Sequence, residues 1–328
     1  MSTLYLNTQG AVLRKEEHRF LVVKNKEVIL SVPDFKVERI LIYGHVQVTT
    51  QAMRFAMKNN IPITFLTMYG RFIGSTLPAF SKNILLRISQ FDKLSDKSKK
   101  ISLSKKVIRS KITNSISMLK RFFRSEKEEI TGLEEIKMNA RRLENANSIN
   151  AIRGIEGIVS SIYFSNIRKL LEPYIEFHGR NYHPAKDPFN SLLNFLYSLV
   201  ANEMLGIIYA KGLDPYYGFL HAVEYGRVSL VFDLIEPFRA SIADSLAVKM
   251  FKKFTLTKND FEKHNIYGFV LKSEKRKIVL ANYEMQMEKE FSYNGKRTNF
   301  RKAIMEQLES FSSYINGEGD FKPFTILK

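Results

Sequence analysis

The sequence of 328 residues contains no cysteine. Disulfide frameworks, thiolate-bound zinc and cysteine nucleophiles are therefore excluded, and the composition fits a reducing compartment. The chain also lacks a run of about 18 apolar residues of the kind that spans a bilayer. Its first residues, MSTLYLNTQG, lack the charged and apolar regions of a signal peptide. We therefore expect a soluble, cytoplasmic protein.

Acidic residues are few compared with basic ones. The chain has 51 Lys and Arg but only 33 Asp and Glu, which gives a formal net charge of +18. Hydrophobic residues make up 45% of the chain, with 25 Phe and 15 Tyr, so an ordered core is expected. The basic residues are spread along the whole chain, and such a charge attracts polyanions. This composition favours a nucleic acid partner, although a merely solubilising basic surface would show the same excess.

The first part of the chain has the pattern of short strands separated by turn residues. The predicted strands are Thr3–Asn7, Phe20–Lys24, Val28–Val32, Arg39–Tyr43 and Ile61–Leu66. Between the last two, Thr49 or Thr50 can cap a helix that continues through Met57. We predict a small β-sandwich or β-roll domain with one helix over residues 1–76.

From about Phe91 onward, apolar residues recur at helical spacing instead. The clearest stripe is Ile108, Ile112, Ile116, Leu119 and Phe123, and further helices are predicted near 132–146, 149–170, 190–211, 240–255 and 298–315. Residues 93–106 are dense in lysine and serine and are expected to be exposed. We therefore predict an α+β multi-domain protein, with a linker over residues 77–92 and an all-α C-terminal domain over 93–328.

Glu156 lies in an unexpected place on its predicted helix. On a helical wheel it falls about 40° from Ile152, inside the apolar stripe rather than opposite it. An unpaired buried carboxylate costs several kcal/mol, so this side chain should pair with a cation, share a proton or hold a metal. A structural salt bridge to Arg153 or Arg168 is the alternative to a functional role.

A second polar cluster contains His221, Asp233 and Glu236. Magnesium and manganese prefer oxygen ligands, and manganese also accepts an imidazole, so these residues with Glu156 could form a metal site. Two carboxylates three residues apart can face one ion. Pro237 offers another interpretation, because proline is tolerated in the first turn of a helix, where Asp233 would be the N-cap of a capping-box-like pair. The histidine could equally be a hydrogen-bonded structural residue.

Several motifs, in this order, resemble the CRISPR-associated spacer-acquisition integrase family. They are Gly154–Gly157 (GIEG), Lys186–Asn190 (KDPFN), Gly218–His221 (GFLH), Gly226–Arg239 (GRVSLVFDLIEPFR) and Asp244. The early strands are similar to the β domain of that family, so the resemblance covers essentially the whole chain. Its strongest motifs lie between Gly154 and Asp244.

The resemblance implies a metal-dependent DNA endonuclease and integrase that acts in CRISPR adaptation. The metal ligands of that family correspond to Glu156, His221 and Glu236, and Asp233 would be a further catalytic residue beside them. The ion would be Mn²⁺ or Mg²⁺. The family often carries aspartate where Glu236 stands here. The implied partners are double-stranded DNA, as spacer precursor and CRISPR repeat, a second copy of the chain, and a small ferredoxin-like CRISPR-associated adaptation protein.

Basic residues are candidates for contact with DNA. Arg227 and Arg239 could bind phosphate or orient a carboxylate. Candidates for the DNA backbone are Lys82, Arg87, Lys249, Lys252 and Lys253. Two other functions stay open: a metal-dependent repair or junction-resolving nuclease, and a non-catalytic DNA-binding dimer.

Overall fold

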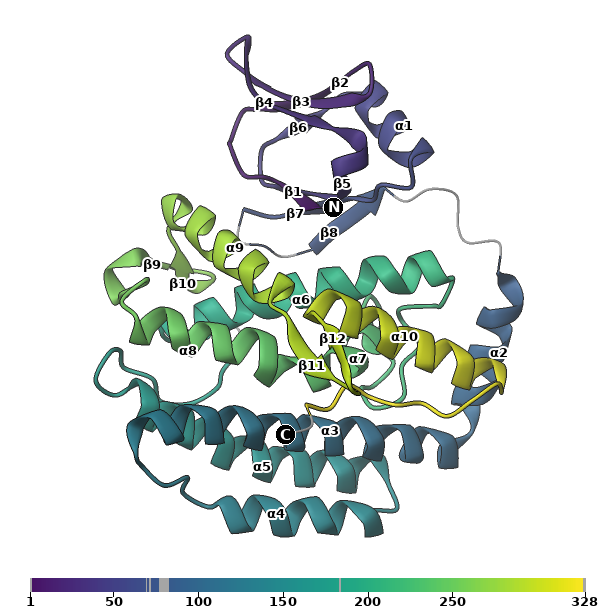
Figure 1. The fold of residues 1–328 in the computed structure, drawn as a ribbon, viewed down its shortest axis with the longest axis vertical. Helices are drawn as coiled ribbons and strands as arrows, with labels where there is room; N and C mark the ends of the chain where they lie inside the picture. Colours follow the sequence, from purple (N-terminus) through teal and green to yellow (C-terminus); the bar gives the residue numbers. More distant parts are fainter. Residues whose placement is uncertain (1, 69, 71, 77–82, 183, 327–328) are drawn as a thin grey trace. The chain divides into compact units, whose positions relative to one another are not determined.

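The computed structural model describes residues 2–68, 70, 72–76, 83–182 and 184–326. The chain forms two compact units, Met1–Lys82 and Asn83–Lys328 (Figure 1). The first contains mostly strands and the second mostly helices, which confirms the predicted α+β organisation.

The described part of the N-terminal unit contains two sheets and one α-helix. One sheet has the strand order β1-β5-β7-β8 and the other β4-β3-β2-β6. The strands are β1 Ser2–Leu6, β2 Val12–Glu16, β3 Arg19–Lys24, β4 Glu27–Pro33, β5 Val37–Tyr43, β6 Gln47–Val48, β7 Ile63–Leu66 and β8 Phe72–Thr76. Leu13 and Phe20 of one sheet share a buried core with Ile40 and Ile63 of the other, so the unit is a sandwich.

Helix α1, Thr50–Lys58, begins as predicted, because the Thr49 side chain accepts a hydrogen bond from the Ala52 amide at 3.2 Å. Strands β2, β6 and β8 were not predicted. In β2 the sequence VLRKE buries only Leu13, so its pattern is too polar to indicate a strand. Its conformation is set by antiparallel pairing with β3.

The C-terminal unit is built around long helices. They are α2 Ile84–Ser95, α3 Lys97–Glu126, α4 Leu133–Arg142, α5 Ile149–Leu171, α6 Pro188–Lys211, α7 Ser229–Arg239, α8 Ser245–Lys252, α9 Ser273–Glu288 and α10 Phe300–Asn316. Two hairpins, β9 Phe261–His264 with β10 Gly268–Leu271 and β11 Phe291–Tyr293 with β12 Lys296–Thr298, correct the prediction of an all-α domain. These strands have only three or four residues each, too few to show a period.

The structure also corrects the predicted linker, residues 77–92. Helix α2 occupies its second half, capped by the Asn83 side chain, which accepts from the Leu86 amide at 3.1 Å. Residues 77–82 lie outside the described residues. The lysine- and serine-rich segment 93–106 is helical and partly buried, because Asp96 caps α3 and Leu103 packs in the core.

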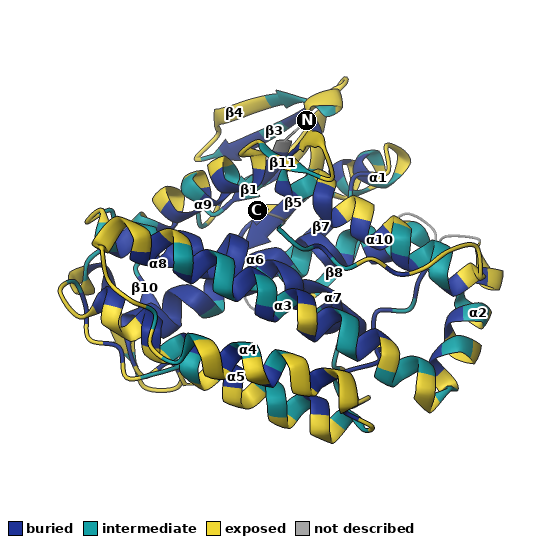
Figure 2. Ribbon diagram, turned by 60° about the horizontal axis from the view of Figure 1, so that its bottom comes forward, coloured by how far each residue is buried: buried dark blue, intermediate teal, exposed yellow. Residues whose placement is uncertain are grey.

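Helices α6 and α7 lie in the core of this unit. By length and composition α6 could cross a membrane, but 67% of its apolar window is buried inside the protein, as in the core helix of a globular fold. Helix α7 contacts both α3 and α6, and α3 contacts α5. Figure 2 shows α6 dark blue, and so buried, along most of its length, and most residues of α7 are buried too. Polar groups carried on α7 are therefore placed inside the protein.

Candidate active site

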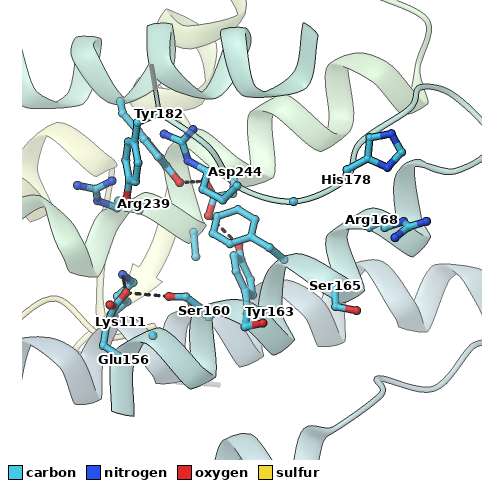
Figure 3. Close-up of a pocket in the computed structure, with 18 residues that line it drawn as sticks. Lys111, Glu156, Ser160, Tyr163, Ser165, Arg168, His178, Tyr182, Arg239 and Asp244 are labelled. Carbon is cyan, nitrogen blue, oxygen red and sulfur yellow. Dashed lines mark hydrogen bonds and ion pairs between the residues drawn. The ribbon is translucent and has the colours of Figure 1, made fainter. Parts of the chain in front are cut away.

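Glu156 and Glu236 are brought together by a lysine that links three helices. Lys111 Nζ of α3 lies 2.5 Å from Glu156 Oε1 of α5 and 2.7 Å from Glu236 Oε2 of α7. Ser160, one turn after Glu156, donates a hydrogen bond to the same Oε1 at 2.7 Å (Figure 3). Glu156 thus forms a salt bridge, but its partner is Lys111 rather than the predicted Arg153 or Arg168.

Glu236 is the more deeply buried of the two carboxylates, with a side chain that is 5% exposed. Burial raises its pKa, but Arg239, whose Nε lies 3.0 Å from Oε1, and Lys111 outweigh burial and hold the pKa at about 2. Glu236 is therefore ionised at neutral pH. Although Lys111 is within ion-pair distance of Oε2, its geometry is not that of a hydrogen bond, and this buried oxygen accepts none from the described residues.

Asp233 organises the loop that carries His221. Its carboxylate is fully buried and accepts hydrogen bonds from the backbone amides of Phe219 at 2.6 Å, Leu220 at 2.9 Å and His221 at 2.9 Å. The His221 ring contacts Asp233 Oδ1 through Nδ1 at 2.6 Å. Because a carboxylate accepts, Nδ1 is the donor, and the neutral form of this ring has a lone pair on Nε2 that a ligand can use.

Arg153 ties this loop to the helix of Glu156. It lies three residues before Glu156 on α5, and its Nε and Nη2 donate to the Leu220 carbonyl at 3.1 and 2.5 Å. The residue next to His221 is thereby attached to the same helix that presents Glu156. The four predicted site residues thus lie on α5, α7 and one loop, and Lys111 and Arg153 connect these elements.

The alternative in which Asp233 is a helix N-cap is wrong. Helix α7 begins at Ser229, so Asp233 lies inside it, and Pro237 lies well beyond the first turn. Proline removes the amide that would pair with the carbonyl four residues earlier, and the helix continues as a π-helical turn, Ala240–Asp244. The Pro237 carbonyl, which precedes this turn, accepts a hydrogen bond from Asn114 Nδ2 of α3 at 2.7 Å.

The side chains present fit a divalent ion chemically, although they are not arranged as a preformed site. Two carboxylates and an imidazole are ligands that manganese accepts, and Glu236 has a buried oxygen with no hydrogen bond from the described residues. Within those same residues, no three His, Asp or Glu side chains form a group that could hold a metal ion. The ammonium of Lys111 stands where the two glutamates converge, so the carboxylates are paired with it instead.

A cavity of about 470 Å³ opens beside Glu156 and Lys111 and extends along α5 to the loop at 178–182 (Figure 3). On its wall Asp244 accepts hydrogen bonds from Tyr163 Oη at 2.8 Å and Tyr197 Oη at 2.5 Å. Burial raises the pKa of the Asp244 carboxyl, although both tyrosine hydroxyls lower it. The cavity also has cationic groups, which makes it suited to an anionic ligand; they are Arg168, Arg180 and Arg239.

Two arginines that were candidates for phosphate contact already have acidic partners. Arg239 pairs with Glu236 and lies over the Tyr197 ring at 4.5 Å from its centroid. Arg227 Nη1 lies 3.0 Å from Glu224 Oε2 near the surface. Arg239 therefore orients a carboxylate, while its guanidinium still faces the cavity.

The lysine candidates differ in environment. Lys249 is partly buried, and burial together with Arg121, Lys289 and Lys253 lowers its pKa to about 8. Lys252 forms an ion pair with Glu126. Lys253 is exposed, Arg87 is half-buried on α2, and Lys82 lies outside the described residues. None of these placements tests contact with DNA.

The family model described as CRISPR associated protein Cas1 matches residues 4–285 of the chain. The chain belongs to the Cas1 family. The resemblance of the motifs is thereby confirmed.

Known Cas1 proteins match this chain over almost its full length. CRISPR-associated endonuclease Cas1 3 of Thermus thermophilus is 30% identical over 325 residues, covering 98% of this chain and 94% of that protein. CRISPR-associated endonuclease Cas1 1 of Thermodesulfovibrio yellowstonii is 32% identical over 327 residues, covering 95% and 100%. A casposase bound to its integration product superposes with a TM-score of 0.87 at 25% identity, covering 100% of this chain and 96% of that one.

The sequence pattern did not indicate every site residue of this Cas1 family member. Lys111 and Arg153 were not assigned to the site, yet each contacts one of its parts directly. A signal was present for Lys111, which lies about 60° from Ile108 on a helical wheel, on the side away from the predicted stripe and between the apolar residues Met118 and Phe122. For Arg153 there was none, because its partner is a backbone carbonyl 67 residues away.

Proposed function

We propose that this protein is a metal-dependent DNA endonuclease and integrase, which inserts spacer DNA into a CRISPR repeat array during adaptation. The observation that carries the proposal is the contact between His221 and Asp233. Asp233 lies on the same helix as Glu236, and Arg153 ties the His221 loop to the helix of Glu156. Two further observations support it: the similar Cas1 proteins are CRISPR-associated endonucleases, and the similar casposase is bound to an integration product.

Glu156, His221 and Glu236 would hold Mn²⁺ or Mg²⁺ in this proposal. The ion, when bound, stabilises negative charge on the attacking oxygen and on the phosphate. Asp233 has both carboxylate oxygens engaged by the loop, so its part is to position His221 and fix its tautomer rather than to add a ligand. Arg239 keeps Glu236 ionised and oriented.

The reaction exchanges one phosphodiester for another. The 3′-oxygen of the spacer end bonds to a phosphorus atom of the repeat, and the bond from that phosphorus to the former 3′-oxygen breaks. The proton lost by the attacking hydroxyl is balanced by the proton gained by the released 3′-hydroxyl. Water in place of the 3′-hydroxyl gives strand cleavage at the same residues.

The proposed assembly contains a second copy of the chain and the small ferredoxin-like CRISPR-associated adaptation protein, and it acts on double-stranded DNA in the cytoplasm. Strand β4 offers a surface for self-association, because three consecutive aliphatic residues are exposed there: Val28 (56%), Ile29 (49%) and Leu30 (42%). Consecutive exposed aliphatic residues on a strand at the edge of a sheet favour pairing with another chain.

An integration assay tests the proposed function. Purified protein, with its small adaptation partner, a spacer duplex and Mn²⁺ or Mg²⁺, should join the duplex to a plasmid that bears the repeat. Joined products at the repeat ends are the expected result. Cleavage of branched DNA without any joined product would instead favour a repair or junction-resolving nuclease, and DNA binding with neither product would favour a non-catalytic dimer.

DNA binding should weaken steeply with salt, because lysines and arginines displace counterions from the phosphates. With about six phosphate contacts, affinity falls about a thousandfold between roughly 50 and 200 mM salt. Fluorescence anisotropy of a labelled duplex at several salt concentrations gives the slope. An affinity independent of salt would contradict the role assigned to the net charge of +18.

A further inference from the structure

Lys111 occupies the position between the two carboxylates that the proposed function assigns to a metal ion. Its ammonium lies 2.5 Å from Glu156 Oε1 and 2.7 Å from Glu236 Oε2, and its side chain is 18% exposed. Figure 3 shows Lys111 and Glu156 together at one end of the cavity. The lysine therefore serves as an internal counter-ion that keeps two like charges close together.

Charge balance shows why this arrangement is closed to a divalent ion. Glu156 and Glu236 contribute two negative charges, and Lys111 and Arg239 contribute two positive ones, so the four groups sum to zero. A divalent cation on the same carboxylates would add two positive charges within contact distance of the ammonium. Because like charges at this separation repel strongly in a partly buried site, the ion and the ammonium cannot share these oxygens.

The lysine has space and a chemical reason to move. A four-carbon stem carries the ammonium, and the cavity of about 470 Å³ opens directly beside it. An ammonium that leaves two carboxylates needs another anion in their place. A phosphate of DNA bound in the cavity would supply that anion. Its negative charge would also offset part of the positive charge that the ion adds to the site.

We propose that Lys111 holds the cation position while DNA is absent and transfers to a DNA phosphate when the divalent ion binds. This inference rests on the proposed function, since it takes Glu156 and Glu236 as ligands. It makes ion binding and DNA binding mutually dependent: each ligand raises the affinity for the other by the same factor. The ion would then be held firmly only on the DNA-bound protein.

Binding of Mn²⁺ followed by electron paramagnetic resonance tests this, because the signal of free Mn²⁺ is lost when the ion is coordinated. The comparison uses the wild-type protein, Lys111→Met and Lys99→Met, each with and without a duplex. Lys99 lies on the same helix, and its ion pair with Asp96 is at the surface, so it is a matched control. The same measurements on Glu156→Ala with DNA correct for Mn²⁺ held by the duplex itself.

For the wild-type protein and Lys99→Met we expect the duplex to raise Mn²⁺ affinity about tenfold or more. Lys111→Met should bind Mn²⁺ about tenfold more tightly than wild type without DNA, and the duplex should then change its affinity little. Removal of Lys111 also leaves Glu156 and Glu236 facing each other, so this variant should gain more thermal stability from Mn²⁺ than wild type does.

Two results would overturn the inference while leaving the proposed function in place. One is a wild-type Mn²⁺ affinity that DNA does not change, and it can be measured even if Lys111→Met fails to fold. The other is a folded Lys111→Met that binds Mn²⁺ no more tightly than wild type without DNA. If instead wild-type protein with DNA binds no more Mn²⁺ than Glu156→Ala with DNA, the proposed metal site itself is wrong.

Discussion

Glu156→Ala and His221→Ala should each reduce strand transfer and cleavage by about a thousandfold, while DNA affinity measured without divalent ions changes by less than about twofold. Each substitution removes one of three proposed ligands, and the remaining two cannot hold the ion in place. Most basic residues lie elsewhere on the chain, so attraction of the duplex is preserved. Product formation on a radiolabelled spacer and anisotropy of a labelled duplex measure the two effects separately.

Matched substitutions show whether the loss is specific. Glu172→Ala removes a glutamate at the end of the same helix whose side chain is 63% exposed and pairs with Arg168. His18→Ala removes a histidine of the N-terminal unit whose side chain is 87% exposed. Both controls should keep full activity. Full activity of folded Glu156→Ala or His221→Ala with metal present would remove the proposed mechanism.

Asp233→Asn should lower the free energy of unfolding by about 3 kcal/mol and abolish activity. The carboxylate accepts three backbone hydrogen bonds and contacts the His221 ring through its two oxygens. An amide has one acceptor oxygen, and its NH₂ group would face donors in a fully buried position. Urea denaturation followed by circular dichroism measures the stability, and Asp92→Asn, exposed on α2, should leave it unchanged.

Gly218→Ala tests the same loop without touching a charged group. A Cβ atom at this position would lie 2.4 Å from Asp233 Oδ2 and 2.8 Å from the backbone carbon of Ser229, so it cannot be accommodated without moving α7 or the loop. We expect both activity and stability to fall, as in Asp233→Asn. A Gly218→Ala protein with the stability and activity of wild type would show that the loop is not held in the described geometry.

Local periodicity was informative wherever one element has one buried face. Five strands of the N-terminal sandwich (β1, β3, β4, β5 and β7) and helices α5, α6 and α10 follow from the pattern of their apolar residues, and the position of Glu156 within such a stripe marked it correctly as a paired group. Periodicity failed for α7, because nine of its residues are buried and its pattern resembles no single face. The proline inside it then favoured a wrong starting point.

Sequence alone therefore determined the family and the division into a strand-rich and a helical unit, and it predicted the four polar residues of the proposed site. Only the tertiary structure decided what those residues contact: Lys111 between two glutamates, Asp233 beneath the His221 loop, and Arg153 as the tie between loop and helix. The reason is physical. A buried charge must be balanced, but the partner that balances it is set by which helices pack together, and that depends on residues distant in the chain.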